Sequence, residues 1–214
     1  MSGPRDAGTL PVVEVPDPSL TGDRDPTVHG VVLAAGTSSR YGRSNKLLAS
    51  VDDEPMVRRA TRPLAASTLE AVTVVVGDDA ERTRRAVSGL GVDVVTNQAY
   101  ERGQSTTLAA GIEAAAAQGA DAAVVGLGDM PYVASATVDG LVAAYAAGAG
   151  TALAAACDGR RGNPVLFDAA FFGPLRNVEG DIGGREVLLE SNNAALVETG
   201  DPGVLRDINR PEDL

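Results

Sequence analysis

A stretch of small and basic residues between Leu33 and Lys46 has the composition of a phosphate-binding loop. It reads Leu-Ala-Ala-Gly-Thr-Ser-Ser-Arg-Tyr-Gly-Arg-Ser-Asn-Lys and follows an apolar run that begins at Val28. Such a run, bounded by a Gly/Ser loop, is typical of a buried strand, and small residues let backbone amides approach an anion closely. Arg40 and Lys46 add positive charge. The loop therefore suits a nucleoside triphosphate.

The loop alone leaves a second interpretation open, which is an ordinary strand-to-helix turn with solvated basic side chains. Its sequence is neither G-x-G-x-x-G nor G-x-x-x-x-G-K-[ST], so the dinucleotide and P-loop fingerprints do not apply. Residues elsewhere in the chain must decide between the two interpretations.

Asp129 is the first candidate for a metal ligand. It lies in Gly128-Asp129-Met130-Pro131, directly after the apolar run 122–127. An acidic residue at the carboxyl end of a parallel strand points into the crevice where ligands bind, and Mg²⁺ uses one or two carboxylates together with phosphate oxygens. The alternative is an Asp that only forms part of a turn.

Two further segments carry residues suited to a ligand. Segment 97–104 ends with Gly103 beside the start of an Ala-rich helix, for which Ser105 is the expected N-cap; free N–H groups there bind a ligand or are simply capped. Loop 158–164 carries Arg160 and Arg161 and is expected to hold a second anionic substrate or to form an exposed hairpin tip.

Alternating strands and helices must position these residues. Three strand–helix alternations in fewer than a hundred residues predict a three-layer α/β fold, a mostly parallel sheet with helices on both faces. The expected strands are 28–33, 72–76, 92–95, 122–127, 151–156, 165–167 and 195–198, and the expected helices are 55–66, 79–90, 105–118, 135–147 and a short one ending at Glu190.

The length and composition fit one folded domain. A chain of 214 residues with 44% hydrophobic content can bury one core, which we place at residues 28–214. Residues 1–27 are rich in Pro and polar residues and are expected to be a flexible extension, with a docked strand at Val12, Val13 and Val15 as the alternative.

Charge and residue usage exclude several classes of function. The formal net charge of −11 argues against nucleic-acid or anionic membrane partners, and a lone Cys157 fits a reducing compartment. No apolar run reaches the roughly 18 residues of a membrane span and no signal pattern is present, so a cytoplasmic location is expected. His29, the sole histidine, is expected at the surface or a strand edge, which argues against a His-based relay.

Taken together, these motifs resemble the MobA-like nucleotidyltransferase family, and within it the molybdenum cofactor (molybdopterin) cytidylyltransferases. The resemblance covers about residues 28–214. The motifs that carry it, in the order of the family, are Leu33-Ala-Ala-Gly36 with Arg40 and Lys46; Gly103-x-Ser105; Gly128-Asp129-Met130-Pro131; Gly162-Asn163-Pro164; Gly180-Asp181-Ile-Gly183; and Asp207-Ile-Asn209-Arg-Pro-Glu-Asp-Leu214.

The resemblance implies a Rossmann-like fold of the nucleotide-diphospho-sugar transferase type. It also implies transfer of CMP from CTP to a phosphorylated acceptor, molybdopterin or molybdenum cofactor, with Mg²⁺ or Mn²⁺ and release of pyrophosphate. Lys46, Arg40 and Asp129 would be catalytic, and Asp129 and Asn209 would hold the metal. The implied nucleotide-binding residues are Leu33, Ala34, Ala35, Gly36, Thr37, Ser38, Ser39, Arg40, Lys46, Asn97, Gly103, Ser105 and Gly128. The implied acceptor-binding residues are Met130, Pro131, Arg161, Asn163, Pro164, Asp181 and Gly183.

The chain departs from the family pattern at three positions. Asn45 replaces the Pro often found before the loop Lys, Asn209 replaces the second Asp of Asp-x-Asp, and Asn163 replaces the His of Gly-His-Pro. A neutral amide at 209 weakens metal binding, which leaves Asp207 as a substitute ligand. Ala35 resembles the Ala-Ala-Gly of cytidylyltransferases and differs from the Leu-Ala-Gly-Gly of guanylyltransferases, which favours CTP.

Two other functions stay open beside the transferase. The first is an NAD(P)H-dependent reductase on the same scaffold, because nicotine-blue oxidoreductases look like members of this family. The second is a non-catalytic nucleotide-binding cofactor chaperone, which the weaker metal ligand Asn209 favours. For the transferase, the resemblance also implies transient contact with a molybdoenzyme or its chaperone.

Overall fold

An eight-stranded sheet runs through the centre of the molecule in the order β1-β10-β8-β9-β7-β2-β5-β6. The computed structural model describes residues 10–16, 25–37, 45–178 and 184–213. Paired strands are parallel except at β9, which is antiparallel to β7 and β8. The strands are β1 (Val12–Glu14), β2 (Val28–Ala34), β5 (Ala71–Val76), β6 (Asp93–Thr96), β7 (Ala122–Leu127), β8 (Ala152–Cys157), β9 (Arg160–Asp168) and β10 (Ala194–Glu198), and a separate small ladder pairs β3 (Ser50–Val51) with β4 (Glu54–Pro55).

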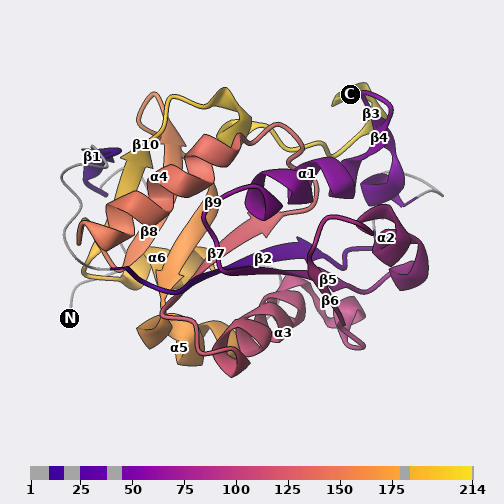
Figure 1. The fold of residues 1–214 in the computed structure, drawn as a ribbon, viewed down its shortest axis with the longest axis horizontal. Coiled ribbons are helices and arrows are strands. Elements are labelled where there is room, and N and C mark those ends of the chain that lie inside the picture. Colours follow the sequence, from indigo (N-terminus) through magenta and orange to yellow (C-terminus); the bar gives the residue numbers. More distant parts are fainter. Residues whose placement is uncertain (1–9, 17–24, 38–44, 179–183, 214) are drawn as a thin grey trace.

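Helices cover both faces of this sheet, as Figure 1 shows. One face packs against α1 (Met56–Ala65), α2 (Ala80–Ala86) and α4 (Ser135–Ala146), and the other against α3 (Gln104–Ala117), α5 (Phe172–Arg176) and α6 (Arg185–Glu190). The predicted three-layer, mostly parallel α/β fold is confirmed. No helix in the described ranges has the length and apolar character needed to cross a membrane.

The central strand β2 divides its side chains between the two cores. Val32 packs in the cluster that contains α1 and α4, whereas Val31 and Leu33 pack in the cluster that contains α3. This alternation follows from the two-residue period of a strand, and both kinds of side chain are apolar because helices cover both faces. Helix α3 approaches β2 so closely that a Cβ at Gly111 would lie 2.2 Å from Val31 Cγ1.

The prediction of a loop at 158–164 is wrong, because most of these residues belong to β9. Asp158 and Gly159 have φ of 53° and 68° and close a tight β8–β9 hairpin. An Asp-Gly pair is suited to a two-residue turn in which both residues adopt positive φ. Arg161 and Asn163 therefore lie on strand β9, just after the exposed hairpin tip that Asp158 and Gly159 form.

Part of the N-terminal extension joins the sheet. Strand β1 pairs in parallel with β10, with Val12 opposite Leu196, and Leu10 is buried. Residues 10–16 are therefore not the flexible segment that their composition predicts, and the alternative of a docked strand describes them. The division of the chain at residue 27 stays a prediction for the rest of the extension.

Helix α3 starts differently from the expectation. Gly103, with φ of 114°, occupies the N-cap position, and Ser105 is buried in the first turn. The N-cap prediction for Ser105 is therefore wrong. Within the described ranges no side chain caps the N–H groups of this first turn, and the Thr106 hydroxyl donates to the Gly103 carbonyl oxygen at 3.0 Å.

His29 is buried in the centre of the sheet, and the prediction of a surface or strand-edge position is wrong. It lies near the amino end of β2, opposite Ala71 of β5 and Ala123 of β7, and is only 3% exposed. Burial lowers the pKa of the imidazole, and the Glu70 carboxylate opposes part of this shift. The site of interest lies at the other end of β2, about 15 Å away at the usual rise per residue.

This burial predicts a loss of stability on mild acidification. Since the pKa of His29 is lower in the folded chain than the roughly 6.5 of an exposed histidine, the unfolded chain binds the proton more tightly. The contribution of His29 to the free energy of unfolding is therefore complete at pH values above the unfolded pKa of about 6.5. It falls as the pH drops from there toward the lower pKa of the folded chain. Denaturant unfolding between pH 7.5 and 5.5 measures the slope. His29→Gln should flatten it, and an unchanged slope in this variant would contradict the assignment.

Candidate active site

Oxygen atoms from two distant parts of the chain converge on the Lys46 ammonium. Lys46 Nζ donates to Asp129 Oδ2 at 2.6 Å, to Asn209 Oδ1 at 3.3 Å and to the Ile208 carbonyl oxygen at 3.4 Å. The Lys46 and Asp129 side chains are 18% and 19% exposed. This arrangement brings together three residues that the sequence analysis placed in the catalytic and metal sites.

The close approach of two strand ends positions Asp129. The Gly128 N–H donates to the Leu33 carbonyl oxygen at 3.0 Å, and a Cβ at Gly128 would lie 3.0 Å from that same oxygen. Glycine therefore lets the turn after β7 pack directly against the end of β2. Asp129 then follows at the edge of the sheet where the strand-end rule placed it.

Lys46 is held by a short 3₁₀ helix, η3 (Lys46–Leu48), whose N-cap is Asn45. The Asn45 side chain accepts from the Leu47 N–H at 3.0 Å and donates to the Asp78 carbonyl oxygen at 3.4 Å. Asn45 thus fixes the backbone before Lys46 by hydrogen bonding, whereas a Pro at this position would fix it by restricting φ. The departure from the family pattern leaves the cation in place.

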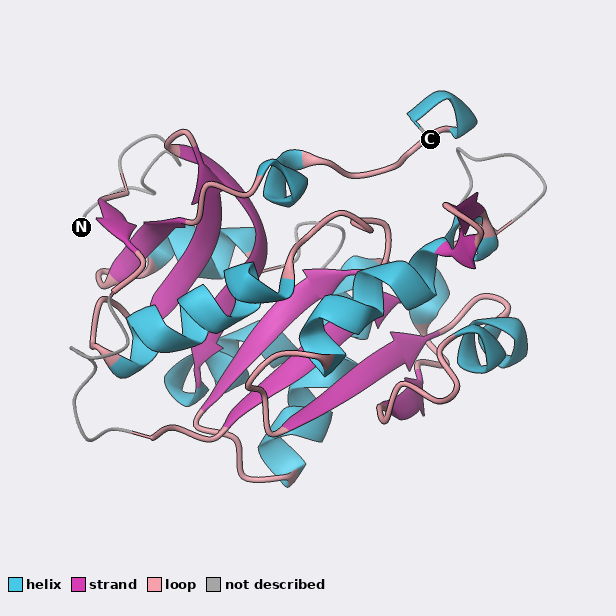
Figure 2. Ribbon diagram, turned by 45° about the horizontal axis from the view of Figure 1, so that its top comes forward, coloured by secondary structure: helices cyan, strands magenta, loops and turns pink. Residues whose placement is uncertain are grey.

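The C-terminal segment delivers Asn209. Figure 2 shows it as a long loop ending in a short helix beside the small β3–β4 ladder. The Ile208 N–H donates to the Asp129 carbonyl oxygen at 3.0 Å, and the buried Ile208 side chain packs with Val51 and Met56. The Arg206 guanidinium stacks on the Tyr132 ring at 3.8 Å. These contacts bring the end of the chain to the turn that carries Asp129.

Two carboxylates orient Asn209. Its amide nitrogen donates to Asp207 Oδ2, which turns the amide oxygen toward Lys46. Asp213 Oδ2 accepts from the backbone N–H groups of Asn209 and Arg210, and these bonds, the Asn209 bond first, lower the pKa of Asp213. Asp207 therefore positions the amide in this structure and does not itself contact Lys46.

The oxygens around Lys46 fit a hard divalent cation. A carboxylate, an amide oxygen and a backbone carbonyl already surround one positive charge, and all three are ligands that Mg²⁺ and Mn²⁺ accept when phosphate oxygens complete the shell. The described residues include no cluster of three or more His, Cys, Asp or Glu that would hold a metal alone. A metal here would therefore depend on the nucleotide.

The predicted nucleotide loop is described only up to residue 37. Ala34 and Ala35 are buried, whereas Gly36 and Thr37 are exposed at the end of β2. The Ala35 carbonyl oxygen accepts from the Asp78 N–H at 3.3 Å, which joins the loop to the end of β5. Ser38, Ser39 and Arg40 lie outside the described residues.

Asn97 is a buried link within the fold. Its amide nitrogen donates to the hydroxyls of Thr106 and Thr107 at 2.9 and 3.2 Å, and its amide oxygen accepts from the Ala99 N–H. The side chain therefore ties the end of β6 to the first turn of α3. This role positions Gly103 and Ser105.

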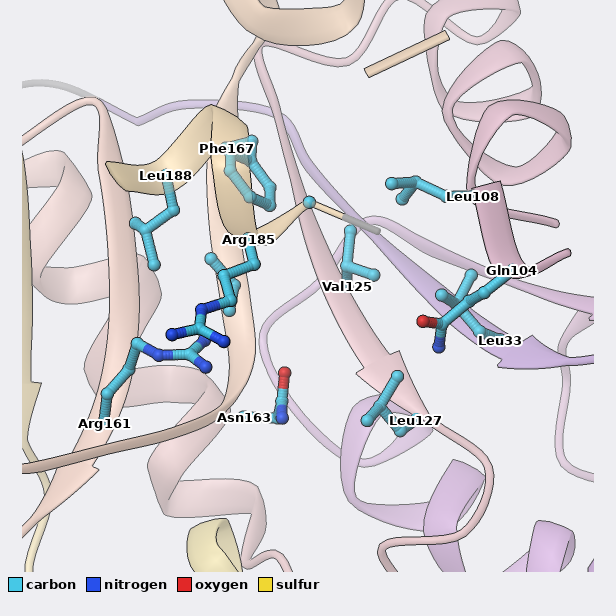
Figure 3. Close-up of a pocket in the computed structure, with 12 residues that line it drawn as sticks. Leu33, Gln104, Leu108, Val125, Leu127, Arg161, Asn163, Phe167, Arg185 and Leu188 are labelled. Atoms are coloured by element: carbon cyan, nitrogen blue, oxygen red, sulfur yellow. The ribbon is translucent and has the colours of Figure 1, made fainter. Parts of the chain in front are cut away.

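The predicted acceptor residues divide into two groups. Arg161 and Asn163 line a cavity of about 210 Å³ on the α3 side of the sheet, and Figure 3 shows them there. Met130 and Pro131 are buried and do not line it, and Pro164 is buried in β9. Asp181 and Gly183 lie outside the described residues.

Sequence reasoning missed Gln104 and Arg185 as lining residues of the same cavity. Gln104 is exposed in the first turn of α3, and Arg185 is exposed at the start of α6. The adjacent Gly103 was the available signal for Gln104, since a residue beside a predicted binding glycine shares its location. For Arg185 the only signal was its place after a glycine-rich segment.

Comparison with known proteins identifies the family. The model of the MobA-like NTP transferase domain matches residues 30–195, well over half of the chain. The chain belongs to the MobA-like NTP transferase family. It is accordingly a nucleotide-binding enzyme of the nucleotidyltransferase type.

Two related proteins align along nearly the whole chain. The purine catabolism protein PucB of Bacillus subtilis is 30% identical, over 89% of this chain and 95% of PucB. The nicotine blue oxidoreductase of Paenarthrobacter nicotinovorans is 28% identical, over 90% of this chain and 98% of that protein. Members of one family thus carry names that refer to different chemistry.

Solved structures share the fold. A nucleotidyl transferase from Methanothermobacter superposes with a TM-score of 0.75 and 26% identity, covering 90% of this chain and 94% of that one. Rv0371c of Mycobacterium tuberculosis, solved as a complex with manganese, superposes with a TM-score of 0.71 and 25% identity, covering 87% and 95%. A divalent metal therefore accompanies this fold in a related protein.

The Lys46–Asp129 contact predicts a measurable coupling. Lys46→Met, Asp129→Asn and the double variant form a mutant cycle, and unfolding in denaturant should give a coupling free energy of about 1 kcal/mol, since the pair is mostly shielded from water. The more exposed pair of Arg176 and Glu113, at 2.7 Å, is the control and should give a value near zero. Equal coupling in the two cycles would show that the Lys46 pair has no special strength.

Proposed function

We propose that this protein transfers CMP from CTP to the phosphate group of a phosphorylated acceptor, with molybdopterin or molybdenum cofactor as the leading candidate, and releases pyrophosphate. The observation that carries the proposal is the convergence of Asp129 and Asn209 on the Lys46 ammonium at the end of β2. A carboxylate and a cation at that edge suit a metal-bound triphosphate.

The reaction would form one P–O bond and break another. An oxygen of the acceptor phosphate attacks the α-phosphorus of CTP, and the bond to the β,γ-diphosphate breaks, so pyrophosphate leaves. A phosphate monoester with a second pKa of about 6 is already mostly ionised at pH 7, so no strong general base is needed. This matches a chain whose sole histidine is buried at the far end of β2.

The side chains would act by alignment and by charge. Asp129 and Asn209 would hold Mg²⁺, which supplies charge neutralisation on the phosphates. Lys46 would neutralise charge that develops on the departing pyrophosphate, and Arg40 is assigned the same role from the sequence pattern. Fixed charges of this kind lower the barrier because they need no rearrangement during the reaction.

One observation favours a second candidate function. The nicotine blue oxidoreductase aligns over 98% of its length, so a reductase that uses NAD(P)H fits the same scaffold. The two functions differ in what they consume. The reductase would oxidise NADPH, whereas the transferase would release pyrophosphate from CTP only when an acceptor is present.

Replacing Asp129 tests the metal site. Asp129→Ala should lower Mg²⁺-dependent pyrophosphate release by about 100-fold or more, because one of the few metal ligands is lost. The same variant should also lose the rise in melting temperature that Mn²⁺ and CTP together give to the natural chain. Asp93→Ala, which removes an exposed carboxylate on β6, is the control and should behave as the natural chain does. Full turnover in Asp129→Ala would remove the metal assignment.

The choice of base forms a separate prediction. Thermal shift with each of the four NTPs and Mg²⁺ should give the largest stabilisation with CTP, because a ligand that binds the folded state raises the melting temperature according to its affinity. A larger shift with GTP would overturn the argument from Ala35. A shift with NADPH together with its oxidation would support the reductase instead.

A further inference from the structure

The cavity beside the active-site edge has a mainly apolar wall. Side chains from β2, β7, β9, α3 and α6 enclose about 210 Å³. Its apolar lining comes from Leu33, Leu108, Val125, Leu127, Val165, Phe167 and Leu188. Because typical pockets for drug-sized ligands measure about 300–1,000 Å³, this space fits a body of roughly one ring.

Two arginines supply the positive charge of this cavity. Arg161 projects from β9 and Arg185 from α6, and Figure 3 shows their guanidinium groups side by side, with the Asn163 amide nearby. In the part of the chain that the structure describes, neither guanidinium has an ion pair with a carboxylate. The chain as a whole carries a charge of −11, so this local excess of positive charge is unusual for it.

The two guanidinium groups repel each other. Desolvation and, after it, the charge of Arg185 lower the pKa of Arg161, which nevertheless stays protonated at neutral pH, as arginines in proteins do. An anion between the two groups would remove this repulsion. A phosphate monoester has a charge of about −1.5 to −2 at pH 7 and oxygens that match the arginine donor fork.

The lining distinguishes between kinds of phosphorylated molecule. A sugar ring carries hydroxyl groups that lose their water on binding and then need a protein partner for each lost hydrogen bond. Among the described residues that line the cavity, Gln104 and Asn163 are the only side chains besides the two arginines that can form hydrogen bonds, and the others are apolar. An apolar ring loses little on entering such a space and gains from leaving water.

We infer that Arg161, Arg185 and Asn163 bind the phosphate of the acceptor, and that the acceptor is a phosphate monoester with an apolar, ring-sized body and not a sugar phosphate. The inference rests on the proposed transfer to a phosphorylated acceptor, and among such acceptors it favours a body that is smaller and less polar than that of molybdopterin. It makes Arg185 a specificity-determining residue, since it contributes one of the two charges at the mouth of an otherwise apolar space.

Binding measured without turnover tests the inference. Isothermal titration of the full chain, alone and with Mg²⁺ and a non-hydrolysable CTP analogue, would compare benzyl phosphate, benzyl alcohol and glucose 1-phosphate. Benzyl phosphate, an apolar ring with a phosphate monoester, should bind most tightly. Arg185→Gln and Arg161→Gln should each weaken its binding about tenfold or more, as expected for the loss of a hydrogen bond between charged groups.

Arg160→Gln is the matched control. Arg160 is the exposed neighbour of Arg161 on β9, does not line the cavity, and carries the same charge. It should leave the affinity unchanged, and Arg185→Gln, which alters an exposed residue, should leave the melting temperature unchanged. Equal or tighter binding of glucose 1-phosphate, or an equal effect of the Arg160 variant, would overturn the inference.

Pyrophosphate release measured in parallel separates the two proposals. If benzyl phosphate binds through the two arginines but no acceptor releases pyrophosphate from CTP, the cavity inference stands and the transferase proposal fails. If a sugar phosphate supports release at a rate that Arg185→Gln does not change, the transferase proposal stands and the cavity inference fails.

Discussion

The Lys46 ammonium is the charge on which the geometry of the site depends. Without it, the Asp129 carboxylate, the Asn209 amide oxygen and the Ile208 carbonyl would face one another as three partial or full negative charges. Repulsion of that kind is costly where water is largely excluded. The Lys46 ammonium between them therefore allows Asp129 and Asn209, which are 83 and 163 residues away from it in the sequence, to share a site. A divalent metal satisfies the same requirement. The electrostatics of the apo fold thus already match those of the metal-bound state proposed for it.

An antiparallel strand explains how a second set of ligand-binding residues reaches the same edge. The carboxyl ends of β2 and β7 meet there, and β9 runs in the opposite direction beside β7, so its first residues lie where β7 ends. Arg161 and Asn163 therefore stand beside Leu127 instead of at the far side of the sheet. Side chains along a strand point alternately to the two faces of the sheet. In β2, Leu33 therefore faces the cavity on the α3 side, whereas the next residue, Ala34, faces the opposite core.

Much of this fold could be predicted from the sequence because most of its strands are short apolar runs, and β5, β7 and β8 are followed directly by Gly or Asp. The strand-end rule placed Asp129, and the order of the motifs suggested Asn209. Only residues 165–167 of β9 were predicted as a strand. Its first half was missed because Gly162, Asn163 and Pro164 have low strand propensity, although the Asp158-Gly159 turn predicts a hairpin. The burial of His29 could not be predicted locally, since it depends on which strand becomes central. The place of Arg185 beside Arg161 depends likewise on how α6 packs, which no local pattern encodes.

The position of His29 bears on the chemistry as well as on the fold. A buried imidazole near the amino end of β2 lies about 15 Å from the strand end where Lys46 and Asp129 meet, so it cannot exchange a proton with a ligand there. Among the described residues, the site itself offers a lysine, carboxylates and amides. Transfer between phosphates suits that inventory, because the nucleophile arrives ionised and the leaving group is an anion. Reduction by NAD(P)H would need a proton donor for the reduced product, and Lys46 is the candidate group at this edge. Lys46 Nζ instead donates hydrogen bonds to Asp129, Asn209 and the Ile208 carbonyl oxygen. The cation and oxygen ligands gathered at this edge are those that suit a metal-bound triphosphate, and this is the physical reason to rank phosphoryl chemistry first.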